Sequence, residues 1–518
     1  MRNLLLVCAA ISGASALTAL ACGGGAFNAG QGGNAVDGSV GSDSAADAGD
    51  GGGLDGSGDS ADASDGFDGF TCDPNSTPSV EPCVVTESLG IFVSPNGVDS
   101  AAGTRAAPMR TINAAMDAAK AKGLARVYAC GGMYSVGVLV SIASNRDGLS
   151  LFGGLTCAGW TYDATQQAIV APSSGYALEV DSLVQGVSVV DFGFRGPTPV
   201  NPGDSSIAVF ANASQGVVLT RVSVTSSNGV DGGAGAAFAN YSSPAGPGGN
   251  SASGGDAGGP NNCVDGTFSL GGAGALVGGF PGVGSSMPVV GGGNAGTSGP
   301  TACTAGTQGA NGAANSGGAG VHSSGSLTST GWMTAPGADG VDGNPGQGGG
   351  GGGANAAVTG GGGGGAGGCG GGKGSGGQTG GSSICIASFA SAVTLSSCAL
   401  TAGNGGNGGS GADGSGGQAG GAGGEGACAG GVGGTGAGGS GGGGGAGGSS
   451  FGILWSGTTP PTIDSLAVTN EPTVGGITTG TPGMPGPMGM GASPTGAGNP
   501  GQNGSAGSGG GAMAVTMQ

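Results

Sequence analysis

The chain has 518 residues, of which 137 are glycine and only 4% are aromatic, so its length overstates the hydrophobic core that it can build. Acidic residues outnumber basic residues by 29 to 10, and the pI is about 4.1. This charge repels nucleic-acid phosphates and anionic lipid headgroups, so we expect no nucleic-acid partner.

The first residues have the pattern of a secretory signal. Arg2 precedes an apolar run from Leu4 to Ile11, and small residues lead from there to Cys22. The apolar run is too short to favour spanning a bilayer. We therefore expect residues 1–21 to be a signal peptide and the chain to be exported.

The sequence Ala-Leu-Ala-Cys at 19–22 resembles the lipobox of bacterial lipoproteins, although Ala19 stands where a lipobox usually has Leu. The resemblance implies lipidation of Cys22 and a membrane partner through that lipid anchor. Gly23, in place of a retention signal, favours the outer membrane or cell surface. Several acyl chains would anchor stably, because each buried methylene contributes about 0.8 kcal/mol. The alternative is cleavage by an ordinary signal peptidase and free secretion.

The segment after Cys22 is acidic and nearly free of large apolar side chains. Asp residues recur from Asp37 to Asp68, and no Lys or Arg occurs from 23 to 68. Such a segment buries too little surface to offset its ordering entropy. We expect residues 22–71 to be a disordered tether.

Cysteine usage fits an oxidising compartment. Of the twelve cysteines, Cys8 belongs to the signal and Cys22 is the lipidation candidate, which leaves an even number, ten. Cys72 and Cys83 flank a turn-rich segment and form the most local pair. Two further disulfide candidates are Cys385 and Cys398. We expect no metal site, because the chain has no Cys-x-x-Cys pair and no His-Cys cluster.

Short runs of branched and aromatic residues with turn residues between them recur from residue 90 to residue 228. They stand too close together for crossover helices, which indicates stacked coils of a parallel β-solenoid. One module recurs at 174–196, 205–229, 382–405 and 449–470, each with a first strand, a polar turn and a second strand. We expect the regions near 207, 384 and 451 to lie on neighbouring turns.

One helix is predicted, over residues 111–123. Ile112, Ala115, Met116 and Ala119 share a face at helical spacing, Thr111 can cap the first turn, and Gly123 can end the last. We expect it to cover the open end of the solenoid. The alternative is a helix packed on the solenoid's side.

The segments 92–140 and 151–162 resemble the entry region of pectate-lyase-like right-handed parallel β-helix proteins of unknown function. They share the Pro-x-x-Thr-Ile helix start, the Val-Tyr strand and the Gly-Gly…Cys-x-Gly-Trp feature. The resemblance implies a right-handed parallel β-helix. With the helix above and the Gly-rich tracts that interrupt the modules, we expect an all-β fold, a right-handed parallel β-helix with an N-terminal capping helix and long Gly-rich loop insertions. The resemblance also implies a bridge between Cys130 and Cys157.

Gly-rich tracts divide the solenoid. We expect an N-terminal part of the β-helix at 72–242, an insertion at 243–381, a rung at 382–402, an insertion at 403–448, a rung at 449–470 and a Gly/Pro-rich tail at 471–518. Gly recurs every third residue, for example from 405 to 426, which is the polyproline II period. Bundled helices of that type and a mobile coil both remain open. The tracts resemble the polymorphic Gly-rich repeats of some bacterial surface proteins.

No catalytic set stands out. The only histidine, His322, lies in a Gly-rich tract, which argues against Ser-His-Asp or Cys-His catalysis. Asp191 and Arg195 could form a site, but a solvated ion pair is the simpler interpretation. The GxGxxG matches follow no βαβ pattern, so we expect no nucleotide and no cofactor.

These observations together favour a non-catalytic, lipid-anchored cell-surface protein, a structural or adhesive scaffold of the bacterial envelope, with polysaccharide or another surface component as partner. The first alternative is a polysaccharide-active, pectate-lyase-like enzyme. The second is an ice- or surface-binding polyglycine protein.

Overall fold

The computed structural model describes residues 72–134, 139–277, 292–355, 359–464, 466–467, 508 and 512–518. The chain divides into two compact units, Met1–Gly69 and Phe70–Gln518, and all described residues belong to the second. The expected signal peptide, the tether and Cys22 lie outside the described residues, as does most of the tail expected at 471–518.

The described unit is mostly β-structure, in which three sheets are built largely from parallel strands and helices are few. Sheet A contains, in spatial order, β1 (Gly90–Val93), β2 (Arg126–Cys130), β5 (Ser150–Leu155), β8 (Val187–Val190), β11 (Val217–Thr220), β18 (Val393–Ser396), β21 (Thr462–Ile463) and β22 (Leu466–Ala467). Sheet B contains β3 (Gly132–Tyr134), β6 (Ala168–Val170), β9 (Phe192–Arg195), β12 (Ser223–Thr225) and β19 (Ala399–Thr401). Sheet C contains β4 (Val140–Ile142), β7 (Leu178–Asp181), β10 (Ser206–Asn212), β17 (Ser383–Phe389), β20 (Ser450–Ser456) and β23 (Ala512–Met517).

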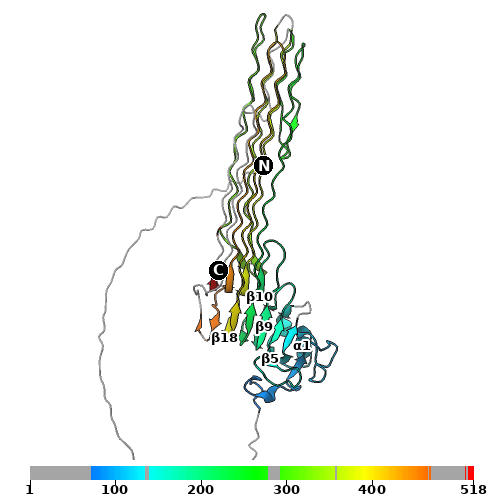
Figure 1. Ribbon diagram of the computed structural model, residues 1–518, viewed down its shortest axis with the longest axis vertical. Coiled ribbons are helices and arrows are strands. Elements are labelled where there is room, and N and C mark those ends of the chain that lie inside the picture. The colour runs from blue at the N-terminus through cyan, green and yellow to red at the C-terminus, as the bar shows by residue number, and fades with distance from the viewer. Residues whose placement is uncertain are drawn as a thin grey trace, which may run out of the picture. The chain divides into compact units, whose positions relative to one another are not determined.

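From β4 to β21, successive strands of these three sheets belong to sheets C, A and B in a repeating order. The Gly-rich tracts lie between a strand of sheet B and the next strand of sheet C. Each strand therefore pairs with the preceding strand of the same sheet, and Figure 1 shows the arrows following one another away from α1. Ile207 of β10 is in register with Ile384 of β17, which is in register with Phe451 of β20. The prediction that these regions lie on neighbouring strands is confirmed.

Because the strands are in register, chemically similar side chains stack on one another. In sheet A, one ladder of buried aliphatic residues consists of Ile91, Val127, Leu151, Val189, Leu219 and Leu395. These residues belong to one apolar cluster with buried residues of sheets B and C. On the other face of sheet A, Phe92 and Tyr128 lie in a second cluster, with ring centroids 5.1 Å apart. Stacking thus supplies the core that no single module can build.

Each module contributes three strands, where the sequence predicted two. In the first three modules the predicted second strand is divided between sheets A and B by one residue with positive φ: Asp191 after β8, Arg221 after β11 and Ser397 after β18. In the fourth module, β21 and β22 instead pair antiparallel within sheet A. A left-handed conformation costs a non-glycine residue roughly 1 kcal/mol. None of these three residues is the Gly or Asn that usually marks such a bend, so the pattern did not reveal it.

The helix α1 (Ile112–Ala121) follows the prediction closely. The side chain of Thr111 accepts a hydrogen bond from the N–H of Ala114, and Gly123 beyond the helix has φ +69°. The four residues expected on one face are the ones that are buried. The helix contacts β1, β2 and β4, so it packs against the edge strands at one end of sheets A and C.

Smaller elements complete the described unit. They are the 3₁₀ turns η1 (Pro82–Val84) and η2 (Ser144–Arg146) and the antiparallel hairpins β13 (Asn261–Asn262) with β14 (Phe268–Ser269) and β15 (Ser326–Thr328) with β16 (Gly331–Met333). Both hairpins fall inside the insertion expected at 243–381. The end of the expected tail is a strand, because β23 pairs in parallel with β20.

Candidate functional site

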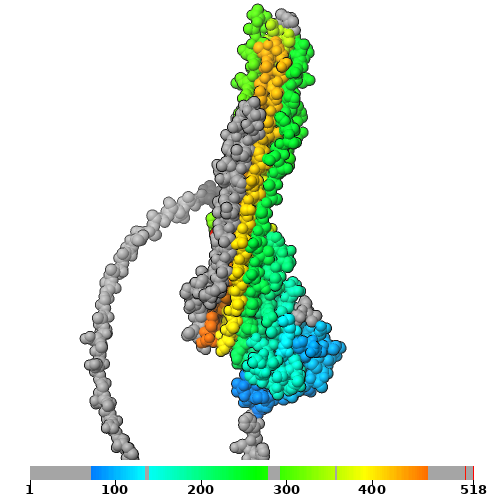
Figure 2. Space-filling view, in the orientation of Figure 1, coloured from blue at the N-terminus to red at the C-terminus, as the bar shows by residue number. Residues whose placement is uncertain are grey.

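The Gly-rich tracts form one hydrogen-bonded array, called here the glycine array. It consists of the segments 229–258, 271–275, 292–299, 304–321, 337–353, 360–381, 403–427 and 428–448. Figures 1 and 2 show these segments running side by side, the yellow and orange ones next to green ones. The array leaves the sheets after β12 and β19 and rejoins them at β17 and β20.

Hydrogen bonds within the array recur every third residue. The antiparallel segments 403–427 and 428–448 are joined by N–H groups of Gly430, Gly433, Gly436, Gly439, Gly442, Gly445 and Gly448, which donate to the carbonyls of Gly424, Gly421, Gln418, Ser415, Ala412, Gly409 and Gly406. A polyproline II helix has three residues per turn and no internal hydrogen bonds. The observed period matches that helix, with every bond made to a neighbouring segment.

Residues three apart in segment 428–448 face the same neighbour, so the segment has three such sets of residues, called phases here. The two phases not yet described face other segments. The N–H groups of Gly431 and Gly434 donate to segment 337–353, and the carbonyls of the same phase accept from segment 360–381. Carbonyls of the third phase, such as those of Val432 and Thr435, accept from segment 304–321. From residue 433 to residue 448 this segment is buried among its neighbours. The ordered alternative, rather than the mobile coil, describes these residues.

Glycine is required here by close approach rather than by backbone conformation. A Cβ atom on Gly433 would lie 1.9 Å from the carbonyl oxygen of Ala366, and one on Gly434 would lie 2.0 Å from that of Ala310. No residue of 360–381 or 403–448 has positive φ. The central segments therefore need glycine in several phases, which explains the unbroken run at 360–365.

Asn and Asp side chains complete the hydrogen bonding at the margin of the array. Side-chain oxygens of Asn228, Asp231, Asn240 and Asn250 accept from the backbone N–H groups of residues 404, 407, 416 and 425. Side chains thus supply acceptors for backbone N–H groups at this margin. These pairs could not be found from local sequence patterns, because the two partners lie about 176 residues apart.

Asp339 and Asp342 do the same on another margin. Their carboxylates accept from the N–H groups of Gly376 and Lys373, and the Lys373 ammonium lies 3.0 Å from Asp339. The N–H of Gly376 and then Lys373 hold the pKa of Asp339 below its ordinary value. These acidic residues have a structural role within the array.

Among the described residues, four cysteine pairs lie at disulfide distance, compatible with disulfide bonds. Cys72 and Cys83, and Cys130 and Cys157, are brought together as expected, with Cα atoms 6.1 and 4.9 Å apart. Two pairs that the sequence did not assign join connecting residues to segments of the array, Cys263 to Cys369 and Cys303 to Cys428.

Cys385 and Cys398 are free thiols in the structure, which corrects their choice as disulfide candidates. Cys385 lies on β17 in sheet C and is fully buried, whereas Cys398 lies between β18 and β19 and contacts the carbonyl of Leu219. Burial raises the pKa of both thiols, so neither is an activated nucleophile.

Asp191 has a different partner from the one considered above. Its carboxylate forms a bidentate pair with Arg221, with N–O distances of 2.8 Å, while Arg195 is exposed at the end of β9. The Asp191 side chain is 5% exposed and the Arg221 side chain 37% exposed, so the ion pair is partly buried. Burial of Arg221 is only partial, and its guanidinium also contacts Ser79.

Three further carboxylates, those of Glu179, Asp181 and Asp204, lie on sheet C and its loops. Burial, and then the neighbouring Asp181, raise the pKa of Glu179. Asp181 accepts a hydrogen bond from Asn212, and Asp204 accepts one from Asn201. His322 is exposed at the end of the array segment 304–321.

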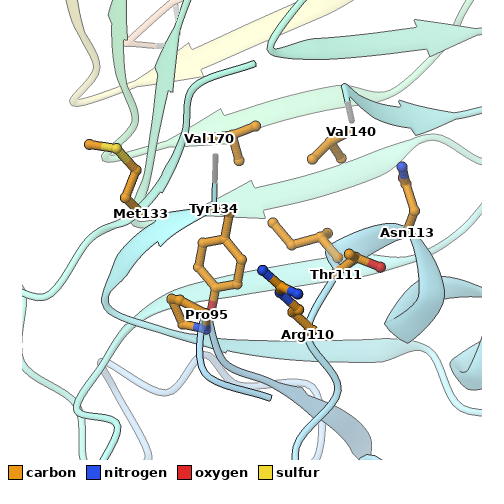
Figure 3. A pocket seen from close by; sticks show the side chains of 9 residues that line it. Pro95, Arg110, Thr111, Asn113, Met133, Tyr134, Val140 and Val170 are labelled. Carbon is orange, nitrogen blue, oxygen red and sulfur yellow. The ribbon is translucent and has the colours of Figure 1, made fainter. Parts of the chain in front are cut away.

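Figure 3 shows a small cavity beside the start of α1, lined by Pro95, Arg110, Thr111, Asn113, Met133 and Tyr134 among others. Its volume is about 30 Å³, which has room for one or two water molecules. The Tyr134 hydroxyl lies 2.9 Å from the carbonyl oxygen of Cys130, and burial raises its pKa. The cavity is too small for a substrate.

Comparison with protein-family models, with curated proteins and with solved structures finds no match. Within the described residues, no helix is long and apolar enough to cross a membrane.

Proposed function

We propose that this chain is a non-catalytic, lipid-anchored protein of the bacterial cell surface that acts as a structural or adhesive display scaffold. The glycine array carries the proposal. At roughly 3.1 Å per residue, a segment such as 360–381 spans on the order of 65 Å. The register places Ala252, Gly360 and Ala427 at one level, far along the array from Gly381, which adjoins β17. A stiff array of this length suits the presentation of turns away from a folded base.

The base is proposed to be a right-handed parallel β-helix, with sheets A, B and C as its faces and α1 as its lid. The repeating order of visits to the three sheets supports a single screw. Parallel strands joined by crossovers are nearly always right-handed. The contacts of α1 with the edge strands of two sheets support the lid rather than a position on the side.

The anchor is tested by growing an expressing bacterium with a radioactive fatty acid and isolating the wild-type protein, Cys22→Ser and Cys8→Ser. We expect label in the wild type and in Cys8→Ser, and none in Cys22→Ser, with the unlabelled variant released from membranes. Equal labelling of Cys22→Ser, or an unlabelled wild type, would overturn the anchor at this residue.

A polysaccharide-active enzyme is the second candidate, favoured by Glu179, since a carboxyl with a raised pKa is a common acid–base group. Incubation of the purified protein with uronic-acid polymers tests it. Unsaturated or reducing products that disappear in Glu179→Gln would overturn the non-catalytic proposal.

An ice- or surface-binding role is the third candidate, favoured by the regular spacing of the array. It predicts thermal hysteresis in a solution of the purified protein. Freezing without hysteresis would remove this candidate and leave the display scaffold unaffected.

A further inference from the structure

A groove lies on the outer side of sheet C, where the loop 197–205 meets the hairpin of β15 and β16. Its volume is about 470 Å³, within the range of small-molecule sites. A second hollow of about 390 Å³ shares Gly203, Asp204 and Thr334 with it and extends along the array to Gln378 and Thr379. The two hollows adjoin, so an elongated ligand can follow both.

Two aromatic rings line the groove and are held from behind. The ring of Tyr176 packs against Phe210 of β10 at 5.0 Å, and the indole of Trp332 meets Phe451 of β20 edge-on at 6.0 Å. Both rings are half-buried. Because their backs are packed, they offer firm apolar surfaces that need little ordering when a ligand binds.

The hairpin brings these two rings together. Gly331 has φ +112°, and a Cβ atom there would lie 2.4 Å from the Tyr176 hydroxyl oxygen. Only glycine suits both the conformation and the space. Gly331, next to Trp332, thus leaves room for the Tyr176 hydroxyl.

The rest of the lining is mixed and almost uncharged, with apolar side chains such as Pro199, Val200 and Ile207 beside polar ones. Hydroxyl and amide groups come from Ser173, Ser174, Thr198, Asn201, Ser205, Thr334, Gln378 and Thr379. Asp204 is the single charged residue, and Asn201 donates to its carboxylate at 2.9 Å. The Trp332 Nε1–H is shielded from solvent and has no hydrogen-bond acceptor among the described residues.

The loop that forms one wall is stiff. Three prolines, Pro197, Pro199 and Pro202, restrict it, and the Ser206 hydroxyl donates to the carbonyl of Pro197 at 2.8 Å. The carbonyl of Asp204 accepts from the N–H of Val230 at the start of the array. The groove is therefore formed before any ligand arrives.

We propose that this groove binds a neutral saccharide chain, with hexose rings lying against Tyr176 and Trp332. A pyranose ring has apolar C–H faces, which suit the aromatic surfaces, and a rim of hydroxyls, which suits the amide and hydroxyl lining. Polyuronates are disfavoured, because the one charged group in the lining is a carboxylate and the chain carries a net charge of −19. The site goes beyond display and does not depend on the lipid anchor.

The test is titration of the purified chain with neutral hexasaccharides of glucose and of N-acetylglucosamine, and with an oligogalacturonate, followed by calorimetry and tryptophan fluorescence. Trp160 and Trp455 are only 6% and 3% exposed, so a fluorescence change on binding reports mainly Trp332. We expect a neutral oligosaccharide to bind, with a Kd of about 1 mM or below, and the oligogalacturonate to bind more weakly.

The variant is Trp332→Ala, with Met333→Ala as the matched control. Met333 is adjacent on β16, 57% exposed and outside the lining. Trp332→Ala should lower the affinity roughly tenfold or more and Met333→Ala should leave it unchanged. If Trp332→Ala unfolds the hairpin, saturation-transfer NMR on the wild type replaces it and should show transfer to sugar C–H protons. The proposal would be overturned if no neutral saccharide bound, or if Trp332→Ala bound it as tightly as the wild type. Stronger binding of the oligogalacturonate, or binding of a proline-rich peptide in place of sugars, would also overturn it.

Discussion

The requirement for glycine in the array can be tested by adding a single methyl group. In Gly364→Ala the new Cβ atom would lie 2.0 Å from the carbonyl oxygen of Gly349. Contacts below 3.0 Å are essentially never seen for real Cβ atoms, so segments 360–381 and 337–353 must separate by about 1 Å. The matched control is Gly259→Ala, because a Cβ atom there meets nothing within 4 Å and Gly259 does not have positive φ.

The magnitude follows from the bonds that join the two segments around the substituted residue. They are Gly346 to Gly368, Gly349 to Gly365 and Gly352 to Gly362, each 2.8 or 2.9 Å long. At about 1 kcal/mol net for each bond, their loss destabilises the array by about 3 kcal/mol. Gly259→Ala should instead stabilise by about 0.4–1 kcal/mol, through reduced freedom of the unfolded chain.

The assay is hydrogen exchange followed by mass spectrometry of peptides from 337–381, together with urea unfolding. Gly364→Ala should exchange faster in these peptides than the wild type, while Gly259→Ala should be as well protected as the wild type or better. Equal protection of the two variants would refute the close-packed description of the array.

Three further predictions concern other contacts. The pKa of Asp339 is lowered on folding, so its stabilising effect is complete above the unfolded value of about 3.9 and is lost as pH falls through the folded pKa; the protection factor of the Gly376 N–H, which is the ratio of the intrinsic to the observed exchange rate at the same pH, should therefore fall below about pH 4, and less so in Asp339→Asn. Replacing both Cys263 and Cys369 by Ser should lower the stability of the array by about 2–4 kcal/mol in urea unfolding, and unchanged stability would contradict a bond there. Leu219→Ala removes a fully buried rung of sheet A and should cost about 3–5 kcal/mol, whereas a cost below about 1 kcal/mol would contradict its burial.

Local patterns in the sequence predicted much of the base. The helix could be placed because capping by Thr111, the apolar face and the ending glycine all act within one segment. The modules could be aligned because stacked strands repeat the same alternation, and Ile207, Ile384 and Phe451 do lie in register. The third strand of each module was missed, since a bend at residues such as Arg221 leaves no compositional mark.

The array lay largely beyond prediction, because its order depends on contacts between distant segments. A period of three is equally compatible with a mobile coil, since a polyproline II helix has no bonds of its own. The partners of Asn228 and Asp231 lie about 176 residues away, and Cys263 is 106 residues from Cys369. The groove was missed for the same reason, because Tyr176 lies in a module and Trp332 in the hairpin of an insertion, more than 150 positions later in the chain.

The threefold repeat of the array also restricts how such a chain can change its length in evolution. One extra residue in segment 428–448 would rotate everything beyond it by a third of a turn, so that N–H groups now bonded to segment 403–427 would face another neighbour. An insertion or deletion of three residues restores each face to its partner. Natural variants of this protein should therefore differ in these tracts by multiples of three, with paired changes on adjoining segments, and a frequent single-residue difference would be the pattern that this geometry forbids.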